Sequence, residues 1–239
     1  MYKGIYIAVS GMVLRERQIE TIAQNLANIS TTGYKRDDVS FEDYLMQPDT
    51  APGSVSDGRR MAQMGNVTTD YSSGEFIHTG NPLDVAIGGD GFFALDNNTY
   101  TRSGNFGINS EGIIVDQRGH QVLGQGGGIS VAGAEGPVSI GDDGSVSVGG
   151  QVVDIIRIVK FDDNTKLQRA GGGGFRTDAQ PQAVDTPDVR QGFLEASNVN
   201  AVAEMVKMMA AQREYESFQG VISSFDSSAS RITNDLARS

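Results

Sequence analysis

The fold is decided by the stretch at the C-terminal end of the chain, residues 201–236, which reads AVAEMVKMMAAQREYESFQGVISSFDSSASRITNDL. Apolar side chains recur there every seven residues, and a second set follows three residues behind the first. This spacing predicts a long helix with a narrow apolar seam along one face. The seam consists of Ala201, Met208, Tyr215, Ile222, Ala229 and Leu236, joined by Ala211, Phe218, Phe225 and Ile232.

The N-terminal residues 5–29 carry a seam of the same kind. We expect a first helix over residues 1–30 that ends at Ser30–Gly33 and belongs to the mature chain, because the apolar residues after Lys3 are not followed by a convincing cleavage site. Few apolar residues lie off either seam, so neither helix can bury its apolar face alone. We expect the two helices to pack against each other or against helices of another copy. The N-terminal seam is formed by Ile5, Met12, Ile19 and Leu26, with Ala8, Ile22 and Ile29 beside them.

The middle of the chain has a different character. More than half of its 31 glycines lie between residues 80 and 150, among short β-prone runs separated by turn sequences. This predicts an all-β domain of antiparallel strands inserted between two terminal helices, which is an α+β fold and not a doubly wound α/β fold. The predicted strands are Leu83–Ile87, Phe92–Leu95, Ile113–Val115, Gln121–Leu123, Val146–Val148 and Val152–Phe161.

These patterns divide the chain into three parts. Residues 1–33 and 196–239 are predicted to form a terminal helical assembly domain, and residues 81–195 a β domain. Residues 34–80 are read as a linker or extended segment, with a short helical turn at Phe41–Met46 and a loop at residues 49–58.

Composition excludes several functions. The net charge of −11 argues against binding of nucleic acid or an anionic bilayer, and no run of apolar residues is long enough to span a membrane. The chain has no cysteine, which removes disulfides, thiolate zinc sites and cysteine nucleophiles. Its two histidines, His78 and His120, show no metal-ligand spacing, and no catalytic or nucleotide-binding motif is present. We therefore expect no enzyme activity, no cofactor and no metal.

The seams have two interpretations. A seven-residue apolar repeat is also typical of a helix that packs on its own domain. We favour packing between subunits, because the seams lie at both ends of the chain and the glycine-rich middle shows no spare apolar face for them.

Four strings resemble the motifs of bacterial flagellar axial proteins, the subunits of rod and hook. They occur in the family's order from near the start of the chain to near its end, so the resemblance covers nearly the whole chain. The strings are NLANISTTGYKR at residues 25–36, LDVAI at 83–87 followed by GFF at 91–93, YTRSGNF at 100–106, and GFLEASNVN at 192–200.

The resemblance implies a structural subunit of the flagellar rod. Such subunits are exported unfolded and uncleaved by the flagellar type III apparatus, and they polymerise with copies of themselves and with other rod proteins. The result is a hollow shaft in the basal body, lined by the terminal helices, that transmits torque from motor to hook. The length of the chain and the short segment after Asp43 favour a proximal-rod subunit, with a distal-rod subunit second. A secreted β-rich enzyme acting on polysaccharide, or an adhesin, remains as an alternative from another class.

The resemblance also implies which residues matter. The seam residues would hold the assembly together, and motif residues would shape the corners between helices and β domain. We expect Gly33 to lie just past the end of the first helix with a positive φ angle. The corner and motif residues are Asn25, Asn28, Gly33, Tyr34, Asn198 and Asn200.

Overall fold

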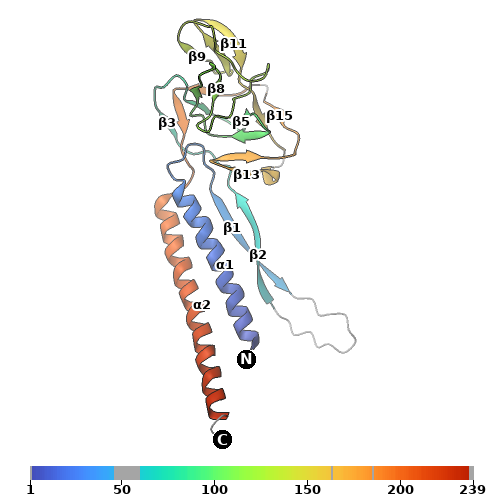
Figure 1. Cartoon of the computed structure of the whole chain (residues 1–239), viewed down its shortest axis with the longest axis vertical. Coiled ribbons are helices and arrows are strands. Elements are labelled where there is room, and N and C mark those ends of the chain that lie inside the picture. The colour runs from blue at the N-terminus through green and yellow to red at the C-terminus, as the bar shows by residue number, and fades with distance from the viewer. Residues whose placement is uncertain (1, 46–59, 163, 185, 237–239) are drawn as a thin grey trace, which may run out of the picture. The chain divides into compact units, whose positions relative to one another are not determined.

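The computed structural model describes residues 2–45, 60–162, 164–184 and 186–236 (Figure 1). The chain divides into two compact units. The helical unit comprises Met1–Ala27, Asp37–Asp70 and Asn200–Ser239, and the β unit comprises Asn28–Arg36 and Tyr71–Val199. The loop predicted at residues 49–58 lies outside the described residues.

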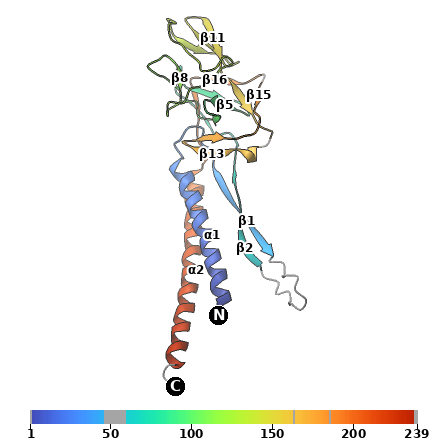
Figure 2. The ribbon, with the colours of Figure 1, turned by 45° about the vertical axis from the view of Figure 1, so that its right-hand side comes forward.

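Two long helices dominate the helical unit. α1 (Tyr2–Ala27) and α2 (Ala201–Leu236) pack side by side and run antiparallel, so that the start of α1 lies on the same side as the end of α2 (Figures 1 and 2). Of the two packings expected for the terminal helices, with each other or with another copy, the structure shows the first. Packing between subunits was favoured for the seams, but the seam residues Phe218 and Phe225 face α1 of the same chain. The first helix is three residues shorter than predicted at its C-terminal end.

A two-stranded hairpin completes this unit. β1 (Asp37–Leu45) pairs antiparallel with β2 (Arg60–Thr69), with a bulge between Val39 and Phe41, and both strands contact α1. The helical turn predicted at Phe41–Met46 is therefore wrong over residues 41–45, which belong to β1. Pairing with β2, some twenty residues away, satisfies their backbone groups and overrides the local pattern.

The β unit consists of short antiparallel strands, and its largest sheet has the order β13-β14-β6-β5-β12-β15. Smaller sheets have the orders β11-β10-β9, β16-β4, β17-β3 and β7-β8. This inserted β region between two helices confirms the predicted α+β class. The strands are β3 (Phe76–His78), β4 (Val85–Ile87), β5 (Phe92–Leu95), β6 (Thr99–Thr101), β7 (Gly107–Ile108), β8 (Ile114–Val115), β9 (Val138–Ile140), β10 (Ser145–Val148), β11 (Gln151–Ile155), β12 (Ile158–Lys160), β13 (Gln168–Gly171), β14 (Gly174–Arg176), β15 (Gln182–Ala183), β16 (Val189–Gln191) and β17 (Phe193–Glu195), with a 3-10 turn, η1 (Asn164–Lys166).

The central strand β5 of the largest sheet is buried on both faces. Alternate residues of a strand point to opposite faces, and in β5 Phe93 and Leu95 join an aliphatic core while Phe92 and Ala94 join an aromatic one. β5 turns into β6 through Asn97 and Asn98, both with positive φ, as a tight hairpin requires. The predicted strand Phe92–Leu95 matches β5, whereas the predicted Val152–Phe161 is broken into β11 and β12.

Candidate assembly site

The helix pair has a single register. Four contacts along it join Gly4 to Phe225, Gly11 to Phe218, Arg15 to Glu214 and Asn25 to Glu204. In every pair the two residue numbers have the same sum, so each step forward along α1 is matched by an equal step back along α2. α1 and α2 therefore form an antiparallel pair of constant register, in which the seven-residue repeats stay in phase.

Two helical glycines of α1 accept phenylalanine rings of α2. A Cβ atom on Gly4 would lie 2.9 Å from Cζ of Phe225, and one on Gly11 would lie 2.7 Å from Cζ of Phe218. Glycine inside a helix costs about 1 kcal/mol relative to alanine. Here the missing side chain lets a ring approach the helix backbone, and this packing offsets that cost.

The predicted seam residues divide between buried and half-buried positions. Ala8, Ile22 and Ala211 are buried, and the other members whose side chains are described are half-buried. Phe218 and Phe225 lie at the contact with α1. The side chains of Ile232 and Leu236 lie outside the described part of α2, and Ile29 follows α1 in the β unit. The half-buried members are Ile5, Met12, Ile19, Leu26, Ile29, Met208, Tyr215, Phe218, Ile222 and Phe225.

A second set of apolar side chains was missed by sequence reasoning. These residues are exposed on the helices, with Tyr6 at 69% and Val202 at 72%. A helical-wheel projection of α2 would have found them, because Val202, Met205, Val206 and Met209 lie together on a face beside the predicted seam. On the two helices they are Tyr6, Ile7, Val9, Val13, Val202, Met205, Val206, Met209 and Val221.

A buried polar cluster closes one end of the helix pair. The Asn25 side-chain amide donates to the backbone oxygen of Asp37 at 2.8 Å and to a carboxylate oxygen of Glu204 at 3.3 Å, and its oxygen accepts from the Asp37 backbone N–H. Glu204 also accepts from Lys207. Asn25 thus joins α1, α2 and the start of β1. A buried asparagine at a helix–helix seam is a device that fixes register.

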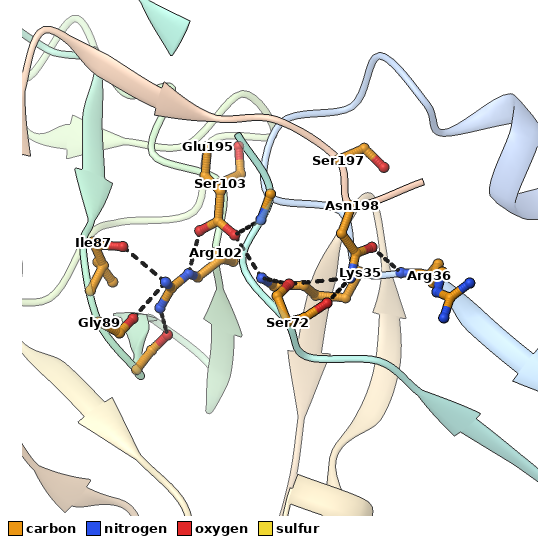
Figure 3. A network of polar contacts seen from close by, with 12 residues as sticks. Lys35, Arg36, Ser72, Ile87, Gly89, Arg102, Ser103, Glu195, Ser197 and Asn198 are labelled. Atoms are coloured by element: carbon orange, nitrogen blue, oxygen red, sulfur yellow. Dashed lines mark hydrogen bonds and ion pairs between the residues drawn. The ribbon is translucent and has the colours of Figure 1, made fainter. Parts of the chain in front are cut away.

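The β unit contains a buried ion cluster, drawn in Figure 3. Glu195, at the end of β17, is 1% exposed and accepts from Lys35 Nζ at 2.6 Å and from Arg102 Nε at 2.5 Å. Lys35 Nζ also donates to the backbone oxygen of Ser72 at 2.7 Å, and the Gly74 N–H donates to Glu195 at 3.0 Å. One carboxylate thereby holds together segments that are far apart in sequence.

Arg102 extends this cluster to a fourth segment. Its guanidinium donates to the backbone oxygens of Ile87, Gly89 and Gly91. Lys35, Arg102 and Glu195 each belong to one of the quoted motifs, and Ile87 and Gly91 belong to the remaining one. All four motifs therefore meet at one place in the β unit. Sequence reasoning did not single out the three charged residues, although each lies inside one of the quoted motifs.

The cluster keeps Glu195 ionised. Burial alone would raise the pKa of this carboxyl, but the charges of Arg102 and Lys35, with their hydrogen bonds, outweigh burial and hold its pKa below the usual value. Two cations and one anion that are almost fully buried depend on one another, because removing one partner leaves a buried charge uncompensated.

Two corner residues pack within the β unit. Gly33 has φ +65°, the positive angle that was predicted, but it lies six residues beyond the end of α1. A Cβ atom on Gly33 would lie 2.4 Å from the carbonyl carbon of Arg102, so glycine is needed there for space as well as for backbone angle. Tyr34 is buried, and the guanidinium of Arg169 lies 4.6 Å from its ring centre.

The three remaining corner residues are asparagines that bond to backbone or to nearby side chains. Asn28 accepts from the Thr31 hydroxyl at 3.1 Å, and Asn200 caps α2 by accepting from the Ala203 N–H at 3.0 Å. Asn198 accepts from the Arg36 N–H at 2.7 Å and donates to Ser72 at 3.2 Å (Figure 3). Asn198 therefore bonds to both segments at which the chain passes between units: residue 36, after which it leaves the β unit, and residue 72, just after it re-enters that unit.

The described residues offer little for other kinds of site. Across them, no group of three or more His, Cys, Asp or Glu side chains is arranged to hold a metal ion. Nor is any helix within the described ranges apolar enough over sufficient length to cross a bilayer.

Three family models match the chain. "Flagella basal body rod protein" matches residues 5–35, "Flagellar hook protein FlgE/F/G D1 domain" matches residues 86–148, and "Flagellar basal body rod FlgEFG protein C-terminal" matches residues 190–236. The matches thus cover both ends of the chain and much of its β unit.

Similar proteins extend over nearly the full length. The flagellar basal-body rod protein FlgF of Caulobacter vibrioides is 37% identical, with 91% of each chain covered. FlgF of Mesorhizobium japonicum is 36% identical over 99% of this chain and 98% of its own. FlgG of Bacillus subtilis is 32% identical over 98% of this chain and 99% of its own. With these matches and the motifs that meet at Glu195, the chain belongs to the flagellar basal-body rod proteins of the FlgF/FlgG type, a family of structural proteins.

Proposed function

We propose that this chain builds the flagellar rod by placing its helix pair side by side with the helix pairs of neighbouring subunits. The observation that carries the proposal is the division of apolar residues on α1 and α2. One face of each helix is used within the chain, and another face leaves large apolar side chains exposed. Exposed apolar residues gathered on a face are typical of an interaction surface.

In this proposal the predicted seam makes the building block rigid. Gly4 meets Phe225, and α2 continues to Leu236, so its last two turns extend past the level at which α1 begins. We assign this overhang of α2 to contacts with a neighbouring subunit.

The proposed place of the chain is the proximal rod, as a FlgF-type subunit. Two FlgF proteins are 37% and 36% identical to it, against 32% for FlgG of B. subtilis. The alignment with FlgG of B. subtilis spans 265 positions and that with FlgF of M. japonicum 243, for a chain of 239 residues. The shorter alignment supports the FlgF type, with the distal-rod FlgG type second.

The partners in this proposal are copies of the chain, other rod proteins and the flagellar type III export apparatus, which would pass the chain unfolded. The assembled product would be a hollow shaft that carries torque from motor to hook. Contacts of this kind are heterologous, and they generate a helical assembly when they do not close into a ring.

The test is made in a strain whose own copy of the gene is deleted. Supplying this chain should restore motility, and it should be detected by mass spectrometry in isolated basal bodies and traced by cryo-EM at the proximal end of the rod. An Ile222→Asp variant should give no rods, because it places a carboxylate at a half-buried seam position, one turn from Phe218 and Phe225, where its desolvation is unfavourable. Ser223→Asp, exposed on the same helix, is the control and should assemble. Absence of the wild-type chain from complete basal bodies would contradict the proposed function.

A further inference from the structure

The exposed apolar residues of the helix pair form one stripe on each helix, turned away from the other helix. Tyr6 and Val13 each lie two residues from a position that faces α2, since Gly4 and Gly11 receive the rings of α2. Two residues correspond to about 200° around a helix. On α2 the relation is the same. Val202 lies two residues before Glu204, which contacts Asn25 of α1, and Met209 lies two residues before the buried Ala211. The outward stripes of α1 and α2 are therefore on opposite sides of the pair.

The two stripes match each other in spacing. On α1 the exposed residues Tyr6, Val9 and Val13 are separated by three and then four residues. On α2, read backwards, Met209, Val206 and Val202 are also separated by three and then four. Two antiparallel helices with these stripes in contact bring all three pairs together at one register.

We propose, resting on the proposed function above, that the outward stripe of α1 in one copy packs antiparallel against the outward stripe of α2 in a second copy. The pairs are Tyr6 with Met209, Val9 with Val206, and Val13 with Val202. Their residue numbers again have a constant sum, smaller by fourteen than the sum within one chain (Gly4 with Phe225). Fourteen residues are two seven-residue repeats, a shift of about 21 Å along the helix.

The parallel arrangement is disfavoured by charge. Because Met205 is also exposed, a parallel pairing of Tyr6 with Val202, Val9 with Met205 and Val13 with Met209 would satisfy the apolar spacing.

Continued along both helices, however, the parallel register places Arg17 opposite Arg213 and Glu20 opposite Glu216, all exposed. Like charges across an interface oppose association. In the antiparallel register the first residue of α2, Ala201, lies opposite Leu14, so Arg17 and Glu20 have no such counterpart on α2.

The antiparallel register fixes how copies are oriented. α1 and α2 are antiparallel within one chain, so an antiparallel contact between α1 of one copy and α2 of the next makes the two copies point the same way. The contact uses different surfaces on the two copies, and each copy keeps one stripe free for another neighbour. Such an interface is heterologous and continues as a layer of alternating α1 and α2 helices, which suits the wall of a tube.

Cysteine cross-linking tests this register, because the chain has no cysteine of its own. The first two double variants are Tyr6→Cys with Met209→Cys, and Val13→Cys with Val202→Cys. The control, Tyr6→Cys with Val202→Cys, uses two of the same positions, but its two cysteines would face each other only in the parallel register. Basal bodies isolated from strains carrying each variant are treated with a short bis-maleimide and analysed by denaturing gel.

The expected result is cross-linked dimers and larger multimers for the first two variants and monomers for the control. Cross-linking of the control alone, or of none of the three in rods that contain the chain, would overturn the register while leaving the rod function intact. Absence of the wild-type chain from the rods would instead refute the proposed function.

A charge pair gives a second measurement that does not depend on the cysteines. Val9→Lys and Val206→Glu should each reduce swarming at least about tenfold, and the double variant should restore most of it. Normal swarming of the two single variants would also overturn the proposed pairs. So would a double variant that swarms no better than the more impaired of the single variants.

Discussion

Replacing Glu195 with glutamine tests the buried ion cluster of the β unit. The substitution keeps the size of the side chain but removes the one negative charge that faces Lys35 Nζ at 2.6 Å and Arg102 Nε at 2.5 Å. The three side chains are all less than 5% exposed, so water cannot replace the lost charge without opening the fold. Both cations would be left buried next to a neutral amide.

The expected cost is large. Breaking a buried ion pair by removing one partner typically costs about 3–5 kcal/mol. Glu214→Gln on α2 is the matched control: it also removes a carboxylate that pairs with an arginine, Arg15, at 2.5 Å, but the Glu214 side chain is 51% exposed. An exposed pair contributes about 0–1 kcal/mol. The two identical substitutions should therefore differ by at least about 2 kcal/mol.

The assay is urea unfolding of the full-length subunit, followed by two signals. Near-UV circular dichroism reports the buried tyrosines Tyr34 and Tyr100 of the β unit, and the signal at 222 nm is dominated by the helices. Glu195→Gln should shift the first transition strongly to lower urea and should lower the melting temperature of the β unit by about 6 °C or more. A Glu195→Gln subunit as stable as Glu214→Gln would refute the view that this cluster holds the four motif segments together.

Three further outcomes are expected. First, folding lowers the pKa of Glu195 from the ordinary value of 4.5, so the contribution of this group to stability is present above that pH and is lost as the pH falls through the lower, folded pKa. The free energy of unfolding of the wild type should therefore fall with acid in that window, and Glu195→Gln should lack this part of the dependence. Second, Gly11→Ala should destabilise the helix pair by about 1–3 kcal/mol, because a Cβ atom would lie 2.7 Å from the ring of Phe218. The control, Gly220→Ala, has no atom within 4 Å of the new Cβ and should gain up to about 1 kcal/mol of helix stability. Equal melting curves of the two variants, followed at 222 nm, would contradict this. Third, Gly33→Val should abolish motility and lower the urea midpoint of the β unit. The φ angle of Gly33 is +65°, and the new Cβ would lie 2.4 Å from the Arg102 backbone. A motile strain with normal levels of the variant would refute the role of Gly33.

The sequence predicted those parts of the fold that depend on local periodicity. The seven-residue repeats of Ile5–Ile29 and Ala201–Leu236 give the two helices and their pairing, because a narrow seam must be covered by another helix. The run Phe92–Leu95 gives β5, since four consecutive apolar residues between turns are typical of a strand buried on both faces. A positive φ at Gly33 was predicted from its place in the chain and from its residue type.

Long-range contacts could not be predicted in this way. The segment Asp37–Leu45 is a strand because Arg60–Thr69 pairs with it, and nothing within 37–45 specifies that partner. The ion cluster joins Lys35, Arg102 and Glu195 across most of the chain, so no local pattern reveals it. The outward stripes were hidden for a different reason. Most of their residues directly follow a seam residue, about 100° away around the helix, so the stronger seven-residue repeat concealed them.

The position of the ion cluster also explains why the motifs alone do not distinguish one rod protein from another. All four motifs supply atoms to the surroundings of Arg102 and Glu195, so folding of the β unit is a role common to them. This chain, which carries all four, is similar both to FlgF proteins, at 37% and 36% identity, and to FlgG, at 32%. We expect the residues that place a subunit at one level of the rod to lie outside the motifs, on surfaces that meet other subunits. The outward stripes, with Tyr6, Val9 and Val13 on α1 and Val202, Val206 and Met209 on α2, are such surfaces. Exchanging them between a proximal and a distal subunit, with the motifs unchanged, would separate the chemistry of folding from the chemistry of assembly.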